Sequence, residues 1–70
     1  MDRLNETIVL TKAESTRLVV LRKRAGLSRA QLAVQIGVSP DTVGRWERGT
    51  TNITAAARHA LDKALPGVFA

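Results

Sequence analysis

The chain has no cysteine and a single histidine, His59, among its 70 residues. Disulfides and thiolate metal ligands are therefore excluded, and one imidazole cannot assemble a metal site or a nucleophile–base pair by itself. We interpret His59 as a packing or surface residue and expect no metal and no cofactor. An enzyme is not expected either, because the remaining side chains offer no set of acid, base and nucleophile.

Long apolar runs are also missing. The longest run of large apolar residues covers residues 18–21 and ends at Arg22, whereas a membrane span needs ~20 residues. The first residues do not show the charged and then apolar pattern of a signal peptide. We therefore expect a cytoplasmic location and no membrane partner.

Acidic side chains are scarce, with 6 Asp and Glu against 11 Lys and Arg, so the net charge is +5. Most of the excess lies between Arg22 and Arg48, where six basic residues accompany two acidic ones. A basic cluster in a single small domain favours a polyanionic partner such as nucleic acid. A solvated basic face would produce the same count, so charge suggests this partner without proving it.

Helix start signals predict four helices, each opened by a side chain that can cap it. The four expected caps are Thr11, Ser28, Ser39 and Thr54. The first two belong to capping boxes, in which Glu14 and Gln31 complete the pattern three residues later. The helices should end near residues 25, 36, 48 and 65, because glycine or proline follows each of these positions.

Residues 1–10 show no helical spacing and are expected to form an N-terminal arm. Within it, Thr7, Ile8, Val9 and Leu10 form a β-prone run that could be a short strand, which would need a partner. The predicted organisation is therefore this arm, a compact all-α four-helix domain over residues 11–65, and a C-terminal tail over residues 66–70.

The second and third expected helices are joined by only Gly37-Val38-Ser39. A short helix, a glycine-containing turn and a capped second helix are the parts of a helix-turn-helix unit. Ala33 is small where the two helices would touch. The side chains expected to bury the crossing are Ile36, Val38, Val43 and Trp46. Any small helical protein has short turns, so this pattern alone leaves DNA binding open.

Four segments at the right mutual spacing add a more specific signal. They are Ala25-Gly26-Leu27-Ser28, Gln31-Leu32-Ala33, Ile36-Gly37-Val38-Ser39 and Trp46-Glu47-Arg48-Gly49. With them, residues 21–65 closely resemble the Cro/repressor-type (XRE) helix-turn-helix family. The resemblance implies a lambda-repressor-like fold that binds double-stranded DNA, with the third helix in the major groove and the second crossing above the backbone.

The same resemblance places the start of the third helix against the bases. The residues expected there are Ser39, Pro40, Asp41, Thr42, Gly44 and Arg45. Arg45 is the best candidate for base recognition through guanine O6 and N7, with a phosphate contact as the alternative. Asp41 could accept a hydrogen bond from cytosine N4 or serve the helix N-terminus instead. Thr42 could contact a thymine methyl group or a phosphate.

Contacts to the DNA backbone are expected on both sides of this helix. At the start of the second helix they are Ser28, Arg29 and Gln31. After the third helix, where Thr50, Thr51 and Asn52 are expected to form a loop, they are Arg48 and these three residues. Gly44 costs the third helix about 1 kcal/mol relative to alanine, which close approach to DNA or to another helix would explain. Trp46 is expected in the core, and the resemblance implies an ion pair between Glu47 and Arg22.

The expected function is a sequence-specific regulator of transcription, with a phage, prophage or small bacterial repressor as the type, acting in the bacterial nucleoid or in an infected host. Such proteins usually bind paired half-sites as homodimers. The dimer surface could be Ile8, Val9 and Leu10 or Val68 and Phe69, or both segments could fold back onto their own domain. The alternative function is an antitoxin or antirepressor that binds a protein partner on the same scaffold.

Overall fold

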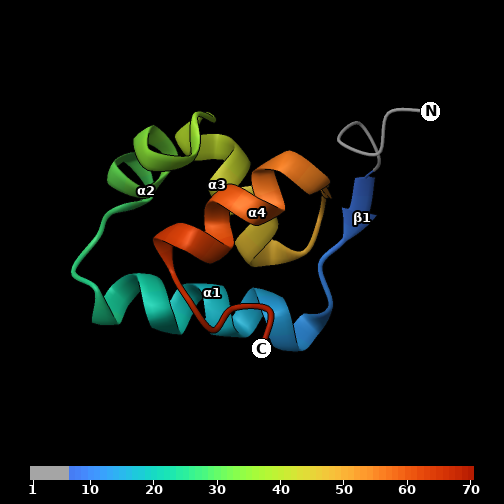
Figure 1. The fold of residues 1–70 in the computed structure, drawn as a ribbon, viewed down its shortest axis with the longest axis horizontal. Coiled ribbons are helices and arrows are strands. Elements are labelled where there is room, and N and C mark those ends of the chain that lie inside the picture. Colours follow the sequence, from blue (N-terminus) through green and yellow to red (C-terminus); the bar gives the residue numbers. More distant parts are fainter. Residues whose placement is uncertain (1–6) are drawn as a thin grey trace.

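Four helices around one core make up most of residues 7–70, the part of the chain that the computed structural model describes (Figure 1). The elements are β1 (Thr7–Val9), α1 (Lys12–Arg24), α2 (Arg29–Ile36), α3 (Pro40–Arg48), β2 (Asn52–Thr54) and α4 (Ala55–Ala64). The predicted all-α class with a short N-terminal strand is confirmed. Residues 1–6 of the expected arm lie outside the described residues.

Every predicted helix cap is present. Thr11 and Ser28 complete their capping boxes with Glu14 and Gln31, so each pair satisfies two backbone N–H groups that the helix start would otherwise leave free. Ser39 accepts a hydrogen bond from the Thr42 backbone N–H at 3.2 Å. Thr54 accepts one from the Ala57 backbone N–H at 3.1 Å. Local sequence therefore defines where all four helices begin.

The core lies where α1, α2, α3 and α4 meet. Its fully buried side chains include one from each helix, and they are Leu18, Leu32, Val43 and Leu61. Trp46 is also buried, as predicted, and its indole N–H donates to the backbone carbonyl of Asn52 at 3.1 Å. This bond satisfies the polar edge of the largest core side chain and ties α3 to the segment that follows it.

A second strand was not expected, because Thr50, Thr51 and Asn52 had been predicted to form a loop. Asn52 instead begins β2, which pairs antiparallel with β1 in the register Ile8 with Ile53. The adjoining side chains of Leu10 and Ile53 are buried. The expected strand thus finds its partner within its own chain.

The C-terminal tail also folds back onto the domain, beside α1 (Figure 1). Val68 is fully buried and Phe69 packs against the core. The Arg17 guanidinium donates to the backbone carbonyl of Ala70 at 2.6 Å, which anchors the tail to α1. Both segments considered as dimer surfaces therefore contact their own domain, while Val9 of the first segment stays exposed. The dimer surface stays a prediction. Within residues 7–70, no helix has the length and apolar character needed to cross a membrane.

Candidate nucleic-acid interface

The helix-turn-helix unit consists of α2, a three-residue connection and α3. Gly37 ends α2 in the left-handed region, with φ of 86°, where a side chain would be strained. The next N–H, of Val38, donates back to the Ala33 carbonyl at 3.0 Å. Ala33 and Val43 are buried between the helices, so the turn and the crossing hold α3 in one orientation relative to α2.

The N-terminal turn of α3 presents a short polar surface. Ser39 and Thr42 share a hydrogen bond of 2.8 Å between their hydroxyl groups, which fixes both side chains. Asp41 and Arg45 lie one helical turn apart and are exposed. The structure therefore brings together four of the side chains predicted to face the bases.

Arg45, the expected base-contacting residue, makes an ion pair within this surface. Its Nε lies 2.8 Å from the Asp41 Oδ2, and the two side chains are 57% and 66% exposed. The sequence suggested that Asp41 contacts a base or serves the helix N-terminus. Its ion pair with Arg45 was not expected. The pair leaves the guanidinium at the surface with one of its edges occupied.

The second acidic residue of α3, Glu47, lies inside the molecule with a side chain that is only 2% exposed. Its carboxylate accepts a hydrogen bond of 2.6 Å from Arg22 Nε and one of 2.8 Å from Arg29 Nε. The predicted Arg22–Glu47 pair is thus confirmed, and Arg29 is a second cation that the sequence did not indicate. The contacts connect α1, α2 and α3 at one carboxylate.

Two opposed effects act on the Glu47 carboxyl. Burial raises its pKa, but hydrogen bonds from Arg22 and Arg29, together with their positive charges, outweigh burial and hold the pKa below its usual range. Glu47 is therefore ionised when the protein is folded at neutral pH. Arg22 also donates to the Leu27 carbonyl at 2.8 Å, so its guanidinium belongs to the interior and is not part of the basic surface.

Gly44 is buried rather than open to solvent, because two arginine side chains cover it. A Cβ atom at this position would lie 3.3 Å from Arg48 Nη1 and 3.8 Å from Arg29 Cδ and Nε. The absence of a side chain therefore gives the Arg48 guanidinium room that a Cβ would narrow, whereas Arg29 would stay at ordinary van der Waals distance. The structure thus shows a close approach by an arginine side chain at this glycine inside a nine-residue helix.

The residues predicted to contact the DNA backbone lie on both sides of α3. Ser28, Arg29 and Gln31 are at the exposed N-terminus of α2, where Ser28 and Gln31 are already joined by capping hydrogen bonds of 2.8 and 3.0 Å. After α3, Arg48, Thr50 and Asn52 are exposed and Thr51 is half-buried. Their contacts to DNA stay predictions.

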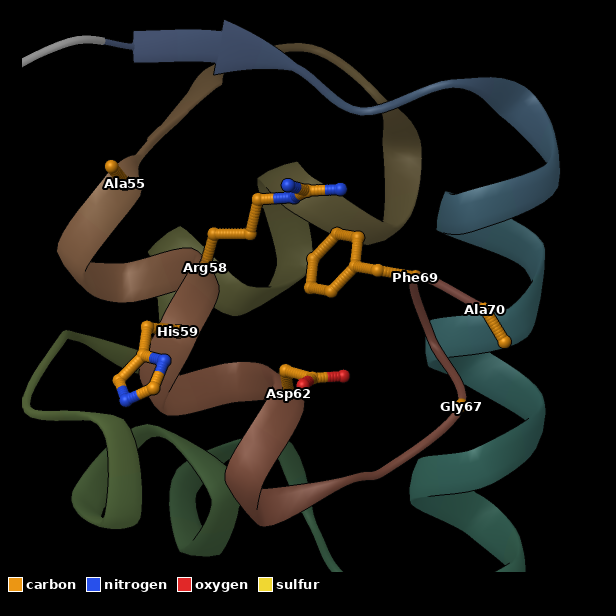
Figure 2. Close-up of a pocket in the computed structure, with 7 residues that line it drawn as sticks. All are labelled: Ala55, Arg58, His59, Asp62, Gly67, Phe69 and Ala70. Carbon is orange, nitrogen blue, oxygen red and sulfur yellow. The ribbon is translucent and has the colours of Figure 1, made fainter.

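A surface hollow of about 560 Å³ lies away from this unit, between α4 and the tail (Figure 2). Its polar lining consists of Arg58, His59 and Asp62. The Arg58 guanidinium lies 4.3 Å from the centroid of the Phe69 ring, and the two side chains point toward each other in Figure 2. This cation–π contact helps to hold the tail in place. Among residues 7–70, no three His, Cys, Asp or Glu residues come together in a way that could hold a metal ion.

Comparison with known proteins agrees with this geometry. Residues 15–66 match the family described as helix-turn-helix domain. A protein of Pyrobaculum aerophilum described as an HTH-type transcriptional regulatory protein is 38% identical over 47 residues, which are 67% of this chain and 19% of that protein. The chain thus spans about a fifth of the length of this relative.

Two solved structures are similar as well. The restriction-modification controller protein C.AhdI from Aeromonas hydrophila has a TM-score of 0.73 and 38% identity, over 80% of this chain and 83% of that chain. The clp gene regulator ClgR from Corynebacterium glutamicum has a TM-score of 0.73 and 26% identity, over 83% of this chain and 62% of that chain.

Proposed function

Because the chain belongs to the helix-turn-helix family, we propose that it regulates transcription by binding a specific double-stranded DNA sequence through α3. The observation that carries this proposal is the polar first turn of α3, held at the end of a tight turn, with Arg45 exposed one helical turn after Asp41. A helix presented in this way fits the width of the major groove, and arginine is the side chain that most often recognises guanine there.

The distribution of charge supports the same function. Arg29 and Arg48 lie side by side over Gly44, and the N-terminus of α2 offers backbone N–H groups beside Arg29. Cations and a helix N-terminus placed next to a groove-contacting helix are suited to phosphates. We assign Arg29 and Arg48 to backbone contacts, with Ser28, Gln31, Thr50, Thr51 and Asn52 around them, and Arg45 to base recognition.

The proposed form on DNA is a homodimer that represses transcription from paired half-sites, because helix-turn-helix proteins usually match a two-fold operator with a two-fold protein. The proposed role is binding without catalysis, in the cytoplasm of the cell that holds the DNA. The similar proteins named above are a transcriptional regulatory protein, a controller protein and a gene regulator. They support regulation over other uses of the fold.

Selection from randomised duplex DNA tests the proposal directly. We expect enrichment of a palindromic sequence, with an affinity that falls steeply as salt increases because bound phosphates release counterions. The spacing of the half-sites then reports the dimer geometry. Failure to enrich any sequence would contradict DNA recognition, and the next experiment would be a search for a protein partner.

Two variants separate base recognition from contacts to the DNA backbone on the enriched duplex. Arg45→Ala should relax the preference at one base pair, whereas Arg29→Ala should weaken binding to all sequences about equally and lower the salt slope by about one. Lys63→Ala, which removes the same charge from the exposed last turn of α4, is the matched control and should change neither property. Equal loss of base preference in the Arg45 and Arg29 variants would refute the assignment.

A further inference from the structure

Asp41 is an unexpected residue on a surface that we assign to DNA. A carboxylate on this face is repelled by phosphates, and its distance from Arg45 shows that it also neutralises part of the charge of the residue proposed to contact a base. An exposed ion pair one turn apart on a helix stabilises a protein little, because solvent screens it and both side chains must be ordered. The ion pair with Arg45 therefore adds little to the stability that Asp41 gives the start of the helix.

The geometry of the contact suggests what it does. The Asp41 Oδ2 lies 2.8 Å from the Arg45 Nε, as an ion pair. A carboxylate beside Nε leaves the two Nη groups of the guanidinium at the far end, and these are a pair of donors with the spacing of guanine O6 and N7. A long arginine side chain that is already fixed by one partner loses less conformational entropy when it binds a base.

The surroundings of the pair favour this role. Asp41 is in the first turn of α3, where the helix dipole stabilises its negative charge without a contact to DNA. The order Asp followed by Arg four residues later is also the favourable direction for such a pair. Ser39 and Thr42, the other polar side chains at this end of α3, hydrogen-bond to each other, and within residues 7–70 the ionic partner of Asp41 is Arg45.

We propose that Asp41 is a positioning residue for recognition: it orients the Arg45 guanidinium end-on toward a guanine and does not itself contact a base. This inference rests on the proposed function and adds to it the kind of base recognised and the residue that makes the contact selective. It implies that Asp41 lowers the overall affinity for DNA while raising the preference for one base pair.

The experiment uses the enriched duplex and its three single-base changes at the position that Arg45→Ala identifies. Asp41→Asn should reduce the preference for guanine at that position on the order of fivefold, because the free Arg45 also samples phosphate contacts. Its affinity for random duplex should stay equal or rise. Asp41→Glu, whose carboxylate can still reach Arg45, should retain most of the preference.

Asp62→Asn is the matched control, since it removes one exposed carboxylate on α4 and changes the net charge equally. It should leave the base preference unchanged. Thermal melting of all variants tests whether Asp41 has a structural role instead. In that case Asp41→Asn would lower the melting temperature and weaken binding to all sequences alike. That pattern would overturn the proposal.

Three further results distinguish failure of the positioning role of Asp41 from failure of the proposed function. A guanine preference that Asp41→Asn leaves intact, or an effect at a base pair different from the one that Arg45 controls, would overturn the positioning role while the proposed function stands. No sequence preference in the unmodified protein would instead overturn the proposed function itself, and the positioning role with it.

Discussion

Helix α3 carries two acidic residues, and each pairs with an arginine through Nε, but in opposite environments. Glu47 lies 2.6 Å from Arg22, and its side chain is almost completely buried. Asp41 lies 2.8 Å from Arg45, and both side chains are mostly exposed. The shortest distances are similar, but Glu47 accepts hydrogen bonds from both Arg22 and Arg29, Asp41 makes a single ion pair with Arg45, and the surroundings are opposite.

The difference teaches how burial divides one helix into a buried face and an exposed face. Little water reaches the Glu47 carboxylate, so loss of Glu47 leaves the charge of Arg22 buried without compensation. Around Asp41 water and salt screen the pair, and either partner can be lost at small cost to folding. The buried face of α3 therefore holds the domain together, while its exposed face is free to bind another molecule.

The largest expected effect comes from breaking the buried pair. Glu47→Ala should lower the free energy of unfolding by about 3–5 kcal/mol, because it strands Arg22 inside the protein. Asp41→Ala should lower it by no more than about 1 kcal/mol. Urea denaturation followed by the fluorescence of Trp46, the single buried tryptophan, measures both values.

A double variant keeps this test interpretable if Glu47→Ala does not fold. Arg22→Met combined with Glu47→Leu removes both charges and fills the space, and it should recover most of the lost stability. If the Glu47→Ala protein is as stable as the Asp41→Ala protein, the buried ion pairs of Glu47 have no special role in stability.

Acid should affect the buried pair in a predictable direction. The folded-state pKa of Glu47 is held below its ordinary value of 4.5, so its contribution to stability is complete above that value. The contribution is lost as the pH falls through the lowered pKa, because the unfolded chain then binds a proton more readily. The loss should be smaller than that of Glu47→Ala, since a protonated carboxyl group still accepts hydrogen bonds.

Urea midpoints measured between neutral and strongly acidic pH test this expectation. The double variant Arg22→Met with Glu47→Leu has no carboxylate at position 47. It should therefore lack the part of the acid-induced loss of stability that Glu47 causes. Identical pH dependence in both proteins would assign the acid sensitivity to other carboxyl groups.

The smallest effect concerns Gly44, in the middle of α3. Gly44→Ala should raise the free energy of unfolding by up to about 1 kcal/mol, because alanine favours the helix and the Arg48 end that it meets is flexible. DNA affinity should fall severalfold as the Arg48 guanidinium is displaced. Melting curves and binding titrations should therefore move in opposite directions.

A double-mutant cycle with Arg48→Ala tests the cause of that loss. Once Arg48 is shortened, Gly44→Ala should have little further effect on DNA binding. An undiminished effect would mean that Gly44 acts through something other than Arg48.

Much of the fold was predictable because its signals are local. Each cap lies three residues from the group that it satisfies, and the glycine or proline that ends each helix lies next to it, so the four helices could be placed from short stretches of sequence. Trp46 in the core and the Arg22–Glu47 pair followed from the resemblance to a known family, and both are confirmed.

The pairing of β1 with β2 could not be predicted in the same way. Each strand has only three residues, and the register joins positions more than forty residues apart. Segments so short carry weak strand signals, and their stability comes from the packing of neighbours such as Leu10 and Ile53 against the helical core. The expectation of a loop at Asn52 was wrong for this reason.

The sequence by itself determined the helix boundaries, the turn between α2 and α3 and the basic character of the domain, since these depend on neighbouring residues and on simple counts. Only the tertiary structure decided how the charges are used. Folding brought Arg29 to Glu47 across eighteen positions, laid two arginines over Gly44 and left Asp41 beside Arg45 in solvent. The physical reason is that the same ionic groups act as structural or binding groups according to how much water surrounds them, and burial is a property of the folded chain.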